Sequence, residues 1–245
     1  MPAFSLLSLN IEGDNHLDLI RKLVLSRQPD IFCVQEIFKS DVSLFEKLLG
    51  VRGYFVPFCR VEAENPFRLN PRGEWGIALF SRKPVTAIHI QTYQGELNHV
   101  PVYLTEDPNA VNRAVLIGSI EFDSTVFCVA TTHFTWTNHG EVSDLQHQHM
   151  DRLLEILKSH EPVVVAGDFN APRGKSVFAR LAAKYKDNIP LEVETTIDQH
   201  LHRKSGIQLV VDGMFTSPQL RVEHIEVIDG VSDHKALFAN ISVSR

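Results

Sequence analysis

Polar side chains of a few chemical kinds follow four short apolar segments of this chain. They are Asn10 with Glu12, Gln35-Glu36, Thr132-His133 and Asp168-Phe169-Asn170. Open α/β sheets bind ligands beyond the carboxyl ends of their strands, so we expect these side chains to meet at one edge. Carboxylates there, without basic neighbours in the sequence, suit a hard divalent cation with oxygen ligands. Amides and imidazoles beside them suit an anion that the same cation contacts, and the pattern therefore predicts phosphate chemistry assisted by Mg²⁺ or Mn²⁺.

The elements that must position these side chains are predicted from hydrophobic periodicity and turn residues. Strands are expected at 3–11, 30–36, 54–58, 76–81, 85–92, 113–122, 125–133, 163–167, 208–215, 222–229 and 236–243. Helices are expected at 14–28, 41–49, 142–160 and 174–184. A strand–helix–strand order occurs around 6–34 and again around 127–166. This repetition indicates two similar halves packed into one domain that spans residues 1–245.

Composition limits the class of protein. The 245 residues are 44% hydrophobic and 22% charged, which is ordinary for a globular chain and argues against disordered, collagen-like and coiled-coil proteins. The net charge of −6 comes without a basic tail, which disfavours a protein that coats nucleic acid or a membrane surface through basic charge. Three cysteines are too few for a disulfide framework, and Cys33 and Cys128 are predicted to be buried. We expect no signal peptide, no membrane span and a cytoplasmic location.

Two polar loops, at 59–75 and 93–112, are the segments in which substrate specificity is expected to reside. Arg113 begins a strand directly after the second loop and is a candidate phosphate clamp. Trp75 and Trp136 lie beside the polar strand ends, so each either lines a substrate groove or packs in the core.

Seven motifs in order along the chain resemble those of the endonuclease/exonuclease/phosphatase superfamily, the deoxyribonuclease-I-like enzymes. They are Leu9-Asn10-Ile11-Glu12-Gly13, Val34-Gln35-Glu36, Gly76-Ile77-Ala78-Leu79-Phe80-Ser81-Arg82, Thr132-His133-Phe134, Gly167-Asp168-Phe169-Asn170-Ala171-Pro172, Val211-Asp212-Gly213-Met214-Phe215 and Ser232-Asp233-His234. The resemblance implies a four-layer α/β/β/α sandwich, in which helices cover two packed, mostly antiparallel sheets. It also implies phosphoester hydrolysis by metal-activated water in a cleft at one end of the sandwich, without a covalent enzyme intermediate.

The resemblance gives each matching position a role. Glu36 is similar to the principal metal ligand, Asn10 to a residue that binds the metal directly or through its ligands, and Asp233 to a metal- or water-binding aspartate. Asp168 resembles the residue that orients and deprotonates the attacking water. Asn170 resembles a donor to the scissile phosphate, so together with Arg113 and Trp136 it is a candidate for substrate binding.

Two histidines complete the predicted site. His234 resembles the imidazole that contacts a phosphate oxygen as negative charge builds, and Asp212 matches the carboxylate that holds it. His133 matches a second histidine of the deoxyribonuclease, sphingomyelinase and tyrosyl-DNA phosphodiesterase branches. Stabilising charge on the non-bridging oxygens is what phosphoryl transfer needs. We therefore predict a Mg²⁺- or Mn²⁺-dependent phosphodiesterase that acts on nucleic acid or a DNA 5′-adduct, with no stable membrane association and no obligate protein partner.

Other interpretations remain open at this point. A phospholipid or inositol-phosphate head-group hydrolase would share the fold. A non-catalytic binding module is disfavoured because the matched positions are intact. A zinc hydrolase would need clustered His or Cys ligands, and His147 and His149, two apart on one helix, face different ways and are predicted to be solvated. Glu12 is either a residue that supports the metal ligands or a solvated charge.

Overall fold

The protein folds into two six-stranded sheets in the computed structural model, which describes residues 3–66, 68–122 and 125–243. Sheet A has the order β11-β12-β1-β2-β4-β3 and sheet B the order β5-β6-β7-β8-β10-β9. The strands of sheet A are β1 (Ala3–Asn10), β2 (Ile31–Phe38), β3 (Gly53–Val61), β4 (Gly73–Ser81), β11 (Leu220–Ile228) and β12 (Ala236–Val243). Those of sheet B are β5 (Val85–Gln94), β6 (Arg113–Phe122), β7 (Thr125–His133), β8 (Val163–Asp168), β9 (Lys186–Asp187) and β10 (Asp212–Thr216).

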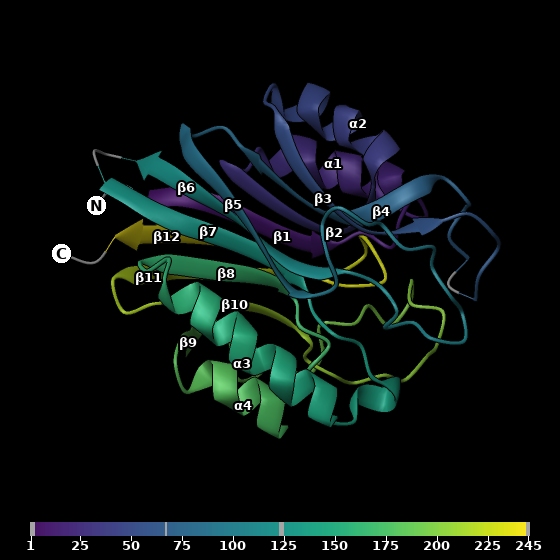
Figure 1. Ribbon diagram of the computed structural model, residues 1–245. Coiled ribbons are helices and arrows are strands. Elements are labelled where there is room, and N and C mark those ends of the chain that lie inside the picture. Colours follow the sequence, from purple (N-terminus) through teal and green to yellow (C-terminus); the bar gives the residue numbers. More distant parts are fainter. Residues whose placement is uncertain (1–2, 67, 123–124, 244–245) are drawn as a thin grey trace.

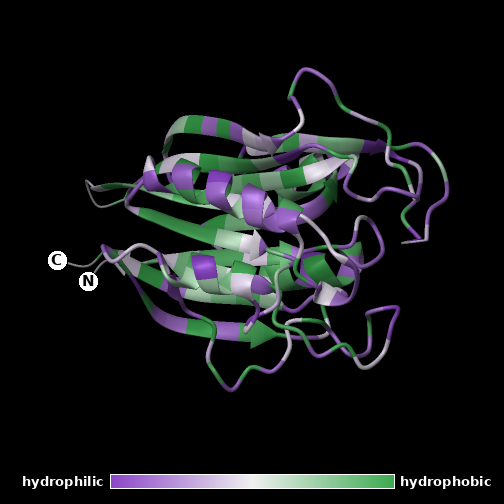
Figure 2. Ribbon diagram, turned by 60° about the horizontal axis from the view of Figure 1, so that its bottom comes forward, coloured by the Kyte–Doolittle hydropathy of each residue, from purple (hydrophilic) through white to green (hydrophobic). Residues whose placement is uncertain are grey.

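The helices lie on the two outer faces of the sandwich (Figure 1). They are α1 (Leu17–Arg27) and α2 (Lys39–Leu49) on sheet A, and α3 (Asp144–Lys158) and α4 (Ser176–Ala182) on sheet B. Side chains alternate across each strand, so in β1 Leu6 faces the other sheet while Leu7 and Leu9 face the helices. In Figure 2 the inner strands are mostly green and the helices show both colours, as amphipathic helices do. The predicted four-layer α/β/β/α sandwich is confirmed.

Each sheet contains one parallel strand pair, and both pairs come from strand–helix–strand units. The first unit, β1-α1-β2, aligns Asn10 with Gln35, and the second unit, β7-α3-β8, aligns His133 with Asp168. The remaining pairs among the described strands are antiparallel. Because parallel neighbours end at the same edge, each unit delivers two polar strand ends to one end of the sandwich, as predicted.

Several boundaries differ from the sequence prediction. The strand expected at 208–215 begins only at Asp212, because the carbonyls of Val210 and Val211 accept from Arg173 and Phe169 in the loop after β8 instead of joining the sheet. The two-residue strand β9 carries no periodic pattern and was missed. Strands β3 and β4 extend into the range expected to be a loop, as far as Val61 and from Gly73.

Burial and helix length settle two further expectations. Cys33 is buried as predicted, but Cys128 is half-buried because it faces outward from β7, with its sulfur 3.8 Å from the Ser119 hydroxyl. Among the described residues, no helix has the length and apolar character needed to cross a membrane.

Candidate active site

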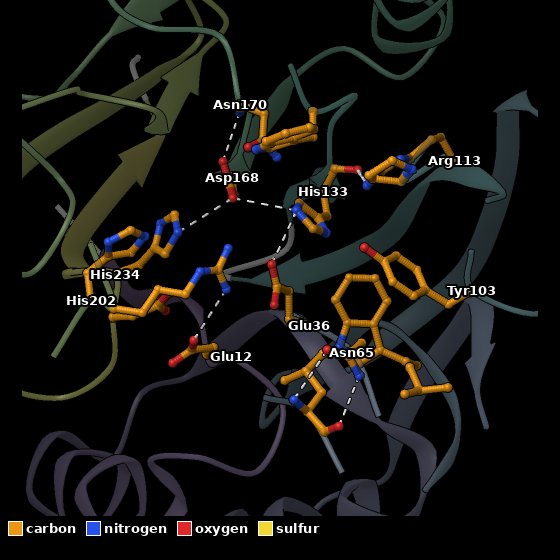
Figure 3. Close-up of a pocket in the computed structure, with 17 residues that line it drawn as sticks. Glu12, Glu36, Asn65, Tyr103, Arg113, His133, Asp168, Asn170, His202 and His234 are labelled. Atoms are coloured by element: carbon orange, nitrogen blue, oxygen red, sulfur yellow. Dashed lines mark hydrogen bonds and ion pairs between the residues drawn. The ribbon is translucent and has the colours of Figure 1, made fainter. Parts of the chain in front are cut away.

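A pocket lies where the carboxyl ends of the two parallel strand pairs meet, and Figure 3 shows the side chains that line it. Its polar wall consists of Glu12, Glu36, Asn65, Arg113, His133, Asp168, Asn170, His202, Arg203, Asp233 and His234. Its apolar wall consists of Val61, Leu69, Trp75, Tyr103, Pro108 and Trp136. The pocket thus places a concentration of carboxylates and imidazoles directly against an apolar surface.

Glu36 enters the pocket because β2 is interrupted there. The pairing of β2 with β4 shifts register between Gln35 and Ile37, and Glu36 itself has a φ of 59°. A bulge of this kind re-aims one side chain out of the alternating pattern. A positive φ in a residue other than glycine costs free energy and clusters at functional sites. Glu12 and Asn170 share this feature, with φ values of 49° and 47°.

Asn10 joins the carboxylates of the two sheets. Its side-chain nitrogen donates to Glu36 Oε1 at 2.9 Å and to Asp168 Oδ2 at 3.1 Å. Its side-chain oxygen accepts from the backbone N–H of Glu12 at 3.1 Å, which fixes the direction of the amide. Asn10 therefore meets the predicted metal ligand, but with its nitrogen and not its oxygen toward the carboxylates.

Asp168 is the most constrained carboxylate of the pocket. Oδ1 accepts from the backbone N–H of Asn170 at 2.8 Å, while Oδ2 lies 3.5 Å from His133 Nε2 and 3.9 Å from His234 Nε2. Burial raises the pKa of Asp168 to about 6, although the charge of His234 opposes this shift. The side chain of Asn170 donates to the carbonyl of Phe134 at 3.2 Å, so the loops after β7 and β8 are joined beside this carboxylate.

His133 bridges the two sheets from the side of sheet B. Its Nε2 lies 3.5 Å from Glu36 Oε1, and the edge of the ring meets Trp75 at 5.6 Å between ring centroids. Burial lowers the pKa of His133 well below its usual range, and the positive charge of Arg113 acts in the same direction. Arg113 is itself buried and donates to the backbone carbonyl of His133 at 3.0 Å. The structure thus places Arg113 behind His133, on the pocket wall, as a support of that segment.

His234 and Asp212 form the pair that the family resemblance implied. His234 Nδ1 lies 2.8 Å from Asp212 Oδ2, which leaves Nε2 facing the pocket. Burial alone would lower the pKa of His234, but neighbouring carboxylates outweigh burial and hold the pKa well above its usual value; they are Asp212, Asp233 and Asp168. The Thr196 hydroxyl accepts from the backbone N–H of Asp212, and the Thr196 carbonyl accepts from Lys235, so one short segment positions both partners.

The donor set fits a divalent cation. Glu36, His133 and Asp168 each offer one ligand atom within 4.8 Å of the others, as do Asp168, Asp212 and His234. Burial and the charge of Asp233 raise the pKa of Glu36 to about 8, although the hydrogen bond from Asn10 and the charge of His234 oppose this shift. Such oxygen-rich, mutually repelling groups are what Mg²⁺ and Mn²⁺ neutralise. The observed chemistry of the pocket is therefore compatible with the predicted cofactor.

The structure brings the predicted site residues together. In the pocket lie Glu36, Arg113, His133, Trp136, Asp168, Asn170, Asp233 and His234, and directly behind them lie Asn10 and Asp212. Asp233 lies on the pocket wall, where its Oδ1 accepts from the Ser232 hydroxyl at 3.3 Å. Trp75 does both things that the sequence left open, since it packs in the core between the sheets and lines the pocket. Glu12 also lines the pocket, within 2.9 Å of the His16 ring.

The prediction that His149 on α3 is solvated was wrong. His149 is buried, and its Nδ1 lies 2.6 Å from the Thr135 hydroxyl. Burial lowers the pKa of His149 to about 4, which keeps the ring neutral at physiological pH. The two histidines do face different ways, as expected, but only His147 lies on the outer side of the helix, where its ring meets Ser176. The inward face of α3 contacts the loop after β7, and no sequence pattern revealed that contact.

Sequence reasoning also missed part of the pocket wall. His202 and Arg203 come from the segment between β9 and β10, where no periodic pattern or motif marks them. Asn65, Leu69, Tyr103 and Pro108 were not named individually, but they belong to the two loops in which specificity was expected to reside.

Comparison with known proteins gives a consistent result. The model of the Endonuclease/Exonuclease/phosphatase family matches residues 7–234. Nocturnin of Drosophila melanogaster is 24% identical over 183 residues, which are 69% of this chain and 27% of that protein, so the chain spans about a quarter of the relative's length. The human Nocturnin catalytic domain with a bound sulfate anion superposes with a TM-score of 0.75 at 20% identity, covering 99% of this chain and 94% of that one. A mannosyl-6-phosphatase of Bacteroides thetaiotaomicron superposes with a TM-score of 0.73 at 16% identity, covering 98% and 99%.

Proposed function

Because the chain belongs to the Endonuclease/Exonuclease/phosphatase family, we propose that it is a Mg²⁺- or Mn²⁺-dependent hydrolase of phosphodiesters. The observation that carries this proposal is the meeting of Glu36, Asp168 and His133 within 3.5 Å contacts, with His234 beside Asp168. These groups come from both sheets, and together they offer the metal site, the base and the acid that hydrolysis of a phosphoester requires.

Each side chain has a task that its contacts support. Glu36 would hold the cation, which would supply charge neutralisation on the phosphate oxygens and lower the pKa of water. Asp168, fixed by the Asn170 N–H, accepts the proton of the attacking water. His234 donates from Nε2 to a phosphate oxygen, because Asp212 holds its Nδ1 proton and stabilises the charged ring.

Two features support a nucleic acid or a DNA 5′-adduct as the substrate. The apolar wall with Trp75, Trp136 and Tyr103 suits a flat ring, such as a nucleobase or a tyrosyl group, next to the scissile phosphate. Both histidine positions are filled, and the Nε2 atoms of His133 and His234 lie 3.5 and 3.9 Å from Asp168 Oδ2. A sugar phosphate or an inositol phosphate would instead offer hydroxyl groups to this apolar wall, and their buried polar atoms would lose hydrogen bonds to water.

The test is hydrolysis of bis(p-nitrophenyl) phosphate by the purified chain in Mg²⁺, in Mn²⁺ and in excess chelator. We expect turnover with either metal, none with chelator, and a loss of ~1,000-fold or more in kcat/KM for Glu36→Gln, because a metal ligand is removed. Glu155→Gln, an exposed position on α3, is the matched control and should be fully active. Full activity of Glu36→Gln, or of the unaltered chain in chelator, would overturn the proposal.

The substrate class is tested separately in the active metal. We expect single-stranded DNA or a 5′-phosphotyrosyl oligonucleotide to be cleaved with a higher kcat/KM than mannose 6-phosphate, inositol phosphates or sphingomyelin. A preference for one of the latter would keep the hydrolase and reject the substrate assignment.

A further inference from the structure

A buried glutamine outside the pocket joins the two loops that carry the site residues of sheet B. Gln146 is 1% exposed and lies on α3. Its side-chain nitrogen donates to the carbonyl of Thr135 at 2.8 Å and to the carbonyl of Asn170 at 3.0 Å. Thr135 follows His133 by two residues and Asn170 follows Asp168 by two. Both hydrogens of one amide are therefore committed to holding the two loops beside each other.

The beginning of α3 places this glutamine. Ser143 precedes the helix, and its hydroxyl accepts from the backbone N–H of Gln146 at 3.2 Å. A Ser-x-x-Gln sequence usually forms a capping box, in which the glutamine side chain returns to the backbone of the cap residue. Here the side chain reaches into the protein instead. The cap fixes the backbone of Gln146, and the amide is directed to the loops.

The carbonyl that Gln146 holds belongs to a strained residue. Asn170 has a φ of 47°, and its backbone N–H is the donor to Asp168 Oδ1 at 2.8 Å. A residue in this conformation persists only where its surroundings fix it. Holding the Asn170 carbonyl from one side restricts the rotation that would turn the N–H away from Asp168. The same amide holds the segment of His133, whose Nε2 lies 3.5 Å from Asp168 Oδ2.

We propose that Gln146 is a positioning residue for the hydrolysis, which sets the mutual orientation of His133, Asp168 and Asn170 without touching the substrate. This inference rests on the proposed function for its kinetic consequence. Its structural consequence, a fixed Asn170 N–H, does not depend on that function. Substitution of Gln146 should lower kcat more than it changes KM, because Glu36, Trp75 and Tyr103 line the pocket from segments that Gln146 does not hold.

The experiment compares Gln146→Met and Gln146→Glu with Gln148→Met, an exposed residue of the same helix that serves as the control. Methionine keeps the length of the side chain and removes both donated hydrogen bonds. Glutamate also removes the donors, and it places carboxylate oxygens against the carbonyls of Thr135 and Asn170, which they repel. At a temperature where circular dichroism shows each variant folded, we expect kcat to fall ~10–100-fold with KM changed less than threefold. An unchanged kcat in a folded variant, or a loss that follows the unfolded fraction, would overturn the proposal.

A second measurement needs no turnover. Hydrogen exchange of the Asn170 N–H, followed by NMR, should be at least tenfold faster in Gln146→Met than in the unaltered chain or in Gln148→Met. Exchange that does not change would overturn the proposal even if activity fell. If the unaltered chain hydrolyses no phosphoester in either metal, the proposed function fails, while the exchange result still decides whether Gln146 fixes the two loops.

Discussion

The two strand–helix–strand units have the same connection and a parallel pair each, yet they prepare their strand ends differently. In β1-α1-β2 the helix contributes apolar contacts through Ile20, Leu23 and Val24, and no side chain caps its beginning. In β7-α3-β8 the helix is capped by Ser143 and sends Gln146 to the loops that hold the site. The two units therefore have the same connection, but in the second unit more side-chain hydrogen bonds hold the ends of the strands.

This difference matches the chemistry of the two carboxylates. Glu36, at the end of the first unit, accepts one hydrogen bond from Asn10 and keeps a raised pKa, so a cation would relieve its unfavourable burial. The pKa of Asp168, at the end of the second unit, is raised less, to about 6, and the Asn170 N–H and Asn10 both donate to this carboxylate. The first unit is therefore suited to bind a cation through Glu36, and the second to hold the Asp168 carboxylate in a fixed orientation.

The largest effect is expected on substitution of the two carboxylates, and it tests whether their roles differ. Asp168→Asn should lower kcat/KM by ~1,000-fold or more, because the group that accepts the proton of water is lost. Glu36→Gln should cause a loss of similar size, but raising Mg²⁺ to tens of millimolar should restore part of its activity, since that residue acts through the cation. Metal titrations of both variants with bis(p-nitrophenyl) phosphate check this prediction. Equal restoration of both variants would show that the two carboxylates do not differ in role.

An intermediate effect is expected on substitution of Asp212, the partner of His234. Asp212→Asn should lower kcat ~10–100-fold, because His234 loses the partner that orients it. Asp212 also helps to hold the pKa of His234 above its usual value, and the protonated ring is the active form. Activity should therefore decline on the alkaline side at a lower pH in the variant than in the unaltered chain. A kcat–pH profile in which the alkaline limb stays in place would contradict this assignment.

The smallest effects concern stability, and the two units should respond to pH with opposite sign. The pKa of Glu36 is raised to about 8, so its stabilising contribution is complete below about 4.5 and is lost as the pH rises toward 8. The pKa of His149 is lowered to about 4, so its contribution is present above about 6.5 and is lost as the pH falls toward 4. In chelator, Glu36→Gln should raise Tm by ~2–4 °C at pH 7.5, with a smaller gain at pH 5.

His149→Gln should behave in the reverse way. It loses the contact with Thr135 at pH 7.5, and its Tm relative to the unaltered chain should improve as the pH falls to 5 because the titrating ring is gone. Calorimetry at the two pH values checks both variants. Parallel pH dependence in the two variants would contradict the opposite signs expected for the two units.

The sequence was sufficient where a residue's position along a strand determines its place in the fold. Asn10, Glu36, His133 and Asp168 were predicted to meet because each follows an apolar strand, and parallel neighbours end at one edge. The pairing of Asp212 with His234 was expected only from the family resemblance, because Asp212 begins β10 of sheet B while His234 lies in the loop between β11 and β12 of sheet A.

Contacts made by long-range packing could not be predicted. His149 was expected to be solvated because helical periodicity says which residues share a face, but not which loop that face meets. Asn10 was expected beside the metal ligand, but the direction of its amide depends on the backbone of Glu12. The segment with His202 and Arg203 is irregular, and its path over the pocket is fixed by contacts such as those of Asp198 with His200 and Gly230.

The amide of Asn10 spans the seam between the sheets, and so does the hydrogen bond from Gln35 to the Thr131 hydroxyl at 2.8 Å beneath it. Each sheet alone therefore holds half of the catalytic apparatus. If the sandwich opened at this seam with every strand and helix intact, the reactive centre would disappear while the secondary structure remained. On heating or in denaturant, enzymatic activity would therefore be lost before circular dichroism shows any loss of helices.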